Sequence, residues 1–175
     1  YNPHGDIILS EDLALNHLFA RGQNVLQKGN NSIKRLDVWA EGESGTNGAF
    51  INLDDASFSV KELYMHMGQL ENHGTLTVME DGFIDALDKD CLNFGNLYFA
   101  DNSKVVNAKL FQNLGCILGS SYSINGRIFD NRHTIKGSAV TLFATEEFSN
   151  SNLIDISFRS VVTSLGNLNN TGKIL

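Results

Sequence analysis

The sequence has little proline, little cysteine and few basic residues. One proline stands against 16 glycines in 175 residues, which favours turns built on glycine, asparagine and serine over proline-fixed kinks. The two cysteines, Cys91 and Cys116, are too few for a disulfide framework. No run approaches the roughly 18 uninterrupted apolar residues of a membrane-spanning helix, so we expect no membrane span.

The charge balance argues against a nucleic-acid partner. Lys and Arg number 13 and Asp and Glu 20, for a formal charge of −7, and no basic cluster interleaved with aromatic residues offers a phosphate-binding surface. Apolar residues make up 42% and charged residues 19% of the chain, a composition typical of a folded protein. A mass of 19.2 kDa predicts a single domain.

A motif with a central asparagine recurs about every twenty residues. It is clearest in Leu70-Glu-Asn-His-Gly-Thr-Leu76 and Cys91-Leu-Asn-Phe-Gly-Asn-Leu97. The steps between successive asparagines are 21, 20, 18, 19 and 20 residues. Such a period indicates a repeat architecture in which each repeat is one structural unit. The asparagines are Asn72, Asn93, Asn113, Asn131, Asn150 and Asn170.

Two apolar positions accompany each asparagine. The residue two places before it is Leu70, Cys91, Phe111, Phe129, Phe148 or Leu168. The residue four places after it is Leu76, Leu97, Ile117, Ile135, Ile154 or Ile174. The positions between them are mixed in character, so the local pattern is that of short strands with one buried side.

Glycine recurs two places after the asparagine, at Gly74, Gly95, Gly115 and Gly172. The exceptions are His133 and Asn152. Because glycine, asparagine and histidine tolerate positive φ better than most residues, the slot predicts a turn through that region.

Twenty residues with two or three short strands cannot bury a core alone, but they suit one coil of a parallel β-helix. In such a solenoid the coils pair about 4.8 Å apart and equivalent side chains stack in columns. We therefore expect an all-β parallel β-helix (solenoid) of roughly eight coils. The asparagines would form a structural ladder of side-chain amides, and Phe111, Phe129 and Phe148 would share one interior column.

The frame is less regular over residues 1–69, where we expect irregular coils or a cap, than over residues 70–175. Gly5, Asn31 and Gly48 are proposed as the equivalents of the glycine slot. Residues 10–28 also fit a short capping helix, with Ser10 as the N-cap and Gly29 as the stop. The sequence ends just after a motif begins a new coil, which predicts a segment of a longer chain.

The frame Leu/Phe-x-Asn-x-Gly-x-Ile/Leu resembles the repeats of the filamentous haemagglutinin family, including the stalks of contact-dependent growth-inhibition exoproteins. The resemblance covers residues 70–175 best. It implies a right-handed parallel β-helix, secretion or a bacterial cell-surface location, and a non-catalytic role as a segment of an adhesin or toxin-delivery filament. The implied partners are neighbouring repeats and a receptor or glycan on a host or target cell. His133, Asn152 and the bulky Phe129 depart from the pattern of that family.

Two other functions stay open. One is a carbohydrate-active enzyme, because a polysaccharide lyase or glycosidase needs converging carboxylates and a basic residue. Asp81 and Asp101, 20 residues apart, would stack on adjacent coils, with Asp85, Asp88, Asp90 and Arg127 near them. The other is a receptor-facing or membrane-translocation module of an intracellular bacterium's toxin. We favour the stalk, and so predict no catalytic residue.

The remaining reactive side chains predict no cofactor and no metal site. The five histidines are never spaced as zinc ligands on one element, and His73 and His133 fall in the turn motif. Asp54 and Asp55 fit a turn. Cys91 falls in an interior position and Cys116 in an outward one, so we expect no disulfide between them.

Overall fold

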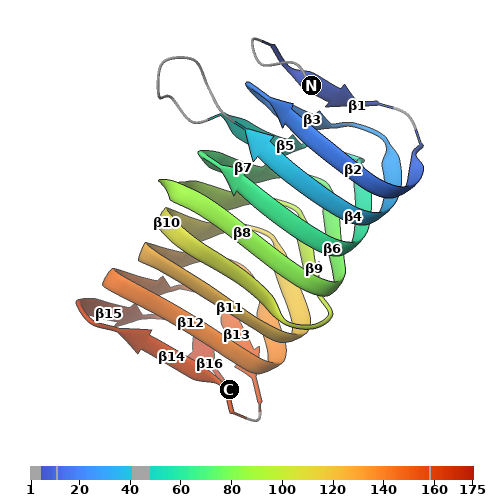
Figure 1. Ribbon diagram of the computed structural model, residues 1–175. Helices are drawn as coiled ribbons and strands as arrows, with labels where there is room; N and C mark the ends of the chain where they lie inside the picture. Colours follow the sequence, from blue (N-terminus) through green and yellow to red (C-terminus); the bar gives the residue numbers. More distant parts are fainter. Residues whose placement is uncertain (1–4, 11, 41–47, 158) are drawn as a thin grey trace.

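The computed structural model describes residues 5–10, 12–40, 48–157 and 159–175. It is an all-β parallel solenoid of about eight coils, with the first and last strands at opposite ends of the stack (Figure 1). All described strands join one 16-stranded sheet in which every pairing is parallel. Within the described residues there is no helix, and hence none that could cross a membrane. The predicted parallel solenoid is confirmed.

In the irregular N-terminal part, each strand pairs with the next strand but one along the chain, as β1 with β3 and β2 with β4. They are β1 (Ile7–Leu9), β2 (Ala14–Gly22), β3 (Val25–Gln27), β4 (Asn30–Ala40), β5 (Ala49–Asn52), β6 (Ser57–Met67) and β7 (Gln69–Asn72).

In the regular coils, four long strands of 11–19 residues bend around the solenoid and short strands of 2–4 residues accompany them. They are β8 (Thr75–Asn93), β9 (Asn96–Phe99), β10 (Ser103–Asn113), β11 (Cys116–Asn131), β12 (Ile135–Asn150), β13 (Leu153–Ile156), β14 (Val161–Ser164), β15 (Asn167–Asn170) and β16 (Lys173–Ile174).

Equivalent residues of successive coils lie opposite one another. Phe111 of β10 pairs with Cys91 of β8 and with Phe129 of β11, and Phe129 pairs with Phe148 of β12. The three phenylalanine rings form one buried column, with 5.4 Å and 4.9 Å between successive ring centroids. The predicted interior column is therefore confirmed.

The two apolar positions of the motif are buried in every repeat except the last. Ten of the twelve side chains are at most 1% exposed, whereas Leu168 is 58% and Ile174 39% exposed. These two residues continue the columns of Phe148 and Ile154 but belong to the terminal strands β15 and β16. The hydrophobic core is thus one continuous cylinder through the repeats that precede Leu168.

The predicted capping helix over residues 10–28 is wrong in the part that the structure describes. Ala14–Gly22 is strand β2, which pairs with β4 from Ala14 to Gly22, and Val25–Gln27 is β3. Apolar residues such as Leu15, Leu18 and Phe19 fit a strand as well as one face of a helix. As a strand, the segment forms hydrogen bonds with the backbone of β4. A helix in the same place would leave the backbone groups on that edge of β4 unpaired.

The proposed frame of the first coils is wrong in register. With Gly48 in the glycine slot, Phe50 should occupy the apolar position that follows the asparagine. It instead occupies the apolar position that precedes the asparagine, opposite Leu70 and Val25. This column runs through Ile7, Val25, Phe50 and Leu70, with steps of 18, 25 and 20 residues. Asn31 lies opposite Phe58 rather than in the glycine slot.

The recurring glycines are required by close backbone approach, not by positive φ. A Cβ atom on Gly95 would lie 2.1 Å from the carbonyl oxygen of Gly74, and one on Gly115 would lie 2.0 Å from that of Gly95. Neither glycine has a φ in the left-handed region, so the predicted conformation is wrong. Each bend packs directly on the bend of the coil before it, where no side chain fits.

Candidate functional site

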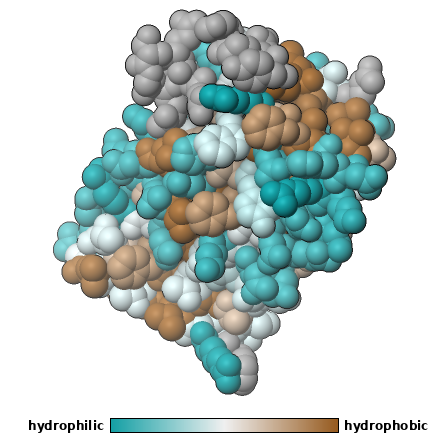
Figure 2. Space-filling model, viewed as in Figure 1, coloured by the Kyte–Doolittle hydropathy of each residue, from teal (hydrophilic) through white to brown (hydrophobic). Residues whose placement is uncertain are grey.

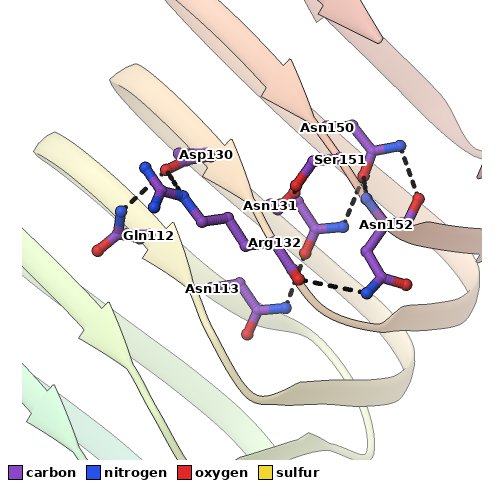
Figure 3. Close-up of polar contacts among 8 residues, drawn as sticks. All are labelled: Gln112, Asn113, Asp130, Asn131, Arg132, Asn150, Ser151 and Asn152. Atoms are coloured by element: carbon purple, nitrogen blue, oxygen red, sulfur yellow. Dashed lines mark hydrogen bonds and ion pairs between the residues drawn. The ribbon is translucent and has the colours of Figure 1, made fainter. Parts of the chain in front are cut away.

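The predicted asparagine ladder runs the length of the regular coils. Each side-chain Nδ2 donates to Oδ1 of the asparagine in the next coil, and the donor–acceptor distances are 2.7–2.8 Å. Figure 3 shows the rungs Asn113, Asn131 and Asn150 with their side chains in line. The asparagine side chains from Asn72 to Asn150 are buried.

The same amides also bind the bends. Asn93 donates to the carbonyl of Cys116, and Asn113 donates to that of Thr134. A buried amide that keeps its partners contributes about 1 kcal/mol net per bond, while an orphaned one costs about 1–3 kcal/mol. The ladder is therefore a structural device that fixes the coil register.

The ladder has a rung that the motif frame missed. Asn52 lies opposite Asn72 and donates to its Oδ1 at 2.7 Å. Gln27 stands opposite Asn52, but its amide donates to the carbonyl of Gly29 instead. Asn52 Oδ1 is consequently buried without a hydrogen-bond partner, so the ladder begins at Asn52.

A groove of about 760 Å³ lies on the bend shared by β8, β10, β11 and β12. It comes from unequal bend lengths in four successive coils. Residues 86–88 of β8 face the single residue Asn107 of β10, and residues 145–146 of β12 face the single residue Arg127 of β11. The residues on either side of the bend stay in register between coils, so the extra residues of β8 and β12 project outward. The coils of β10 and β11 lie between them and form the floor of the groove.

The residues of the groove divide accordingly. Leu87 and Asp88 form one wall, and Phe143 and Thr145 form the other. The floor is made by Asn107, Ala108, Asn125, Gly126 and Arg127.

The first wall and the floor contain strained backbone. Leu87, Asp88 and Asn107 have φ of 48°, 60° and 56°, a region that non-glycine residues rarely occupy. The Asp85 carboxylate holds these bends, since Oδ1 accepts from the Leu87 backbone N–H and from Asn107 Nδ2. Backbone strain of this kind gathers at functional sites.

Arg127, on the floor, forms ion pairs with a carboxylate on each side of the groove. Its Nε lies 3.4 Å from Asp88 Oδ1 and 3.6 Å from Glu146 Oε1. All three side chains are about half exposed, so this ion-paired group is solvated and adjustable.

The structure brings together only part of the acidic group considered above. Arg127 does lie beside Asp88, and Asp85 contacts Asn107. Asp81 instead lies opposite Glu62. Ser103 lies opposite Gly82, so Asp101 is one position out of register with Asp81. The expectation that these two carboxylates stack is wrong, because a register of 21 residues rather than 20 applies there.

The cysteines and turn residues are placed as predicted. Cys91 is fully buried in the column of Leu70 and Phe111, and burial raises the pKa of its thiol to about 12. Cys116 points outward, with Sγ 3.6 Å from Nδ1 of the exposed His133. Both cysteines are free. Asp54 and Asp55 form a turn, with φ of 62° at Asp55.

A second surface cluster lies on β2 and β4. His17 Nε2 is 2.6 Å and Arg35 Nε 3.1 Å from the Asp37 carboxylate. Partial burial opposes ionisation of Asp37, but the hydrogen bonds from Arg35 and His17 outweigh it and lower its pKa. No group of three or more metal-ligating side chains is gathered within the described ranges.

The fold and the ladder define the chain as a parallel β-solenoid with an asparagine ladder. Comparison with protein-family models, with curated proteins and with solved structures gives no match.

Proposed function

We propose that this chain is a non-catalytic stalk segment of a large secreted bacterial exoprotein, either an adhesin or a toxin-delivery filament. The observation that carries the proposal is the unbroken stacking of the regular coils. The asparagine ladder joins the coils from Asn52 to Asn170, and the phenylalanine column adds ring stacking from Phe111 to Phe148. A solenoid fixed in this way presents its side chains at constant spacing and acts as a rigid spacer.

The outer surface supports the same role. Hydrophilic side chains surround separate apolar patches on the face seen in Figure 2. Such a surface suits a protein that displays other elements at a distance from the cell. The expected location is the bacterial surface or the medium, and the expected partner is a receptor or glycan on a host or target cell.

Immunolabelling of the source cells tests this proposal. Antibodies raised against the folded chain should label intact, unpermeabilised cells or detect the parent protein in the medium. Labelling that needs permeabilisation, with none of the protein in the medium, would contradict a secreted stalk. An antibody against a cytosolic protein is the matched control for cell integrity.

The groove gives a specific reason to keep the carbohydrate-active enzyme as a second candidate. Asp88 and Glu146 come from opposite walls and share Arg127, and paired carboxylates are the groups that glycosidases use. Reducing-end assays with polygalacturonate and other polysaccharides test it. Cleavage that disappears in Asp88→Asn and Glu146→Gln would replace the stalk proposal by the enzyme.

A further inference from the structure

We propose that the groove between the bends of β8 and β12 binds a neutral oligosaccharide. This inference rests on the proposed function, because it specifies the glycan partner expected there, while the immunolabelling test of the stalk does not depend on it. It rests on the shape of the groove, on unpaired polar groups in it and on its charge.

The shape suits a chain-like ligand. The walls belong to coils three steps apart, so their backbones are separated by roughly 14 Å if each step is about 4.8 Å. The two floor coils lie between them, and a volume of about 760 Å³ is within the range of ligand sites. A short sugar chain can lie on this floor between the walls.

The groove offers an aromatic face and polar groups side by side. Asn125 and Phe143 occupy the same outward column on adjacent coils. Phe143 is only partly buried, and in the described part of the structure its ring packs against no other ring. A pyranose has an apolar C–H face that packs on such a ring and hydroxyl groups at its rim.

Hydrogen-bonding capacity remains for those hydroxyl groups. The Asn125 side-chain amide and the Thr145 hydroxyl form no hydrogen bond with the residues that the structure describes. Asn107 uses its Nδ2 on Asp85, which leaves its Oδ1 to accept. A ligand with several hydroxyl groups can both donate to and accept from this set.

The charge in the groove argues for a neutral sugar. Asp88 and Arg127 are the charged residues among those that line the groove, and Arg127 is already ion-paired with Asp88 and with the neighbouring Glu146. An acidic sugar would have to displace one of these two carboxylates and would face the other. A neutral sugar can hydrogen-bond to Arg127, Asp88 and Glu146 without separating their charges.

Titration calorimetry on the full chain tests the proposal. The probes are three neutral oligosaccharides, chitotetraose, cellotetraose and mannotetraose, and one acidic oligosaccharide, trigalacturonate. We expect at least one neutral probe to bind in the micromolar to millimolar range. Phe143→Ala and Asn125→Ala should each weaken that binding about tenfold, which is roughly 1.4 kcal/mol. The matched controls, Phe83→Ala and Asn167→Ala, change exposed residues outside the groove and should leave it unchanged.

Backbone NMR of the unsubstituted chain provides a second measurement that does not depend on how the variants fold. The neutral probe should shift the amide signals of residues 87–88, 107–108, 125–127 and 143–145. Absence of binding by all three neutral probes would overturn the proposal. So would binding of trigalacturonate alone, or shifts confined to another face.

Discussion

The rings of Phe129 and Phe148 lie parallel, with an interplanar angle of 1° and 4.9 Å between their centroids. Both are fully buried and sit on adjacent coils in register. The partly exposed pair His73 and Phe94 stacks in nearly the same way, at 4.6 Å and 9°. The molecule therefore contains two ring pairs of similar geometry, one buried and one partly exposed. Comparing them separates the contribution of burial to stability from the contribution of ring contact.

Phe129→Ala should lower the free energy of unfolding by about 3–5 kcal/mol, because it removes a buried ring between two others and leaves a cavity. Urea denaturation followed by circular dichroism measures this change. Phe94→Ala removes the exposed partner of His73 and should cost about 1 kcal/mol or less. Equal losses in the two variants would contradict the assignment of stability to the interior column.

Asn113→Ala should destabilise the fold more than Asn52→Ala. Asn113 accepts from Asn93 and donates to both Asn131 and the carbonyl of Thr134. Its removal leaves buried neighbours without partners, at about 1–3 kcal/mol for each group. Asn52 only donates, to Asn72. Urea midpoints of the two variants check the order, and a larger loss for Asn52→Ala would refute a cooperative ladder.

Gly95→Ala should prevent the close stacking of two bends, since the new Cβ would lie 2.1 Å from the carbonyl oxygen of Gly74. The backbone must shift, and we expect a loss of several kcal/mol or a failure to fold. Gly126→Ala is the matched control, because its Cβ would lie 3.1 Å from the nearest atom, the carbonyl oxygen of Ala108. Thermal melts should show a much smaller decrease for Gly126→Ala; similar decreases would argue against the close-approach explanation.

Cys91 should make stability fall at alkaline pH. Burial raises its thiol pKa from 9.0 to about 12 in the folded chain. The unfolded thiol therefore ionises first as the pH rises, so the stabilisation is complete below pH 9 and is lost between pH 9 and about 12. Burial also raises the pKa of Tyr122, in the same sense. The measurement is the free energy of unfolding across this range for the natural chain and for Cys91→Val, whose decrease should be shallower. Identical pH profiles would contradict the prediction.

The asparagine column could be read from the sequence because it depends only on a period. Phe111, Asn113 and Ile117 recur at one spacing, and parallel stacking converts that spacing into columns. Asn52 escaped the frame for a local reason. Phe50-Ile-Asn52 carries the start of the motif, but the Asp54-Asp55 turn lengthens the bend, so that Phe58, not Ala56, lies opposite Leu76.

The groove could not be predicted in the same way. It depends on how many residues each coil inserts at one bend, and Asn107, Asn125 and Phe143 lie outside the motif. The sequence suggests that Arg127 and Asp88 lie near each other. Their separation of 39 positions does not determine that Asp88 lies on a wall of the groove and Arg127 on its floor. Such positions follow from the register of neighbouring coils, which only the assembled structure supplies.

The asparagine column has a direction. From Asn52 onward every side-chain amide donates toward the following coil, so the bond dipoles add head to tail, with an acceptor at the Asn52 end and a donor at the Asn170 end. A carboxylate accepts but does not donate. Aspartate is therefore incompatible with any rung whose amide must donate to the following coil, such as Asn113. The column thus distinguishes two isosteric side chains, because only the amide can both accept and donate.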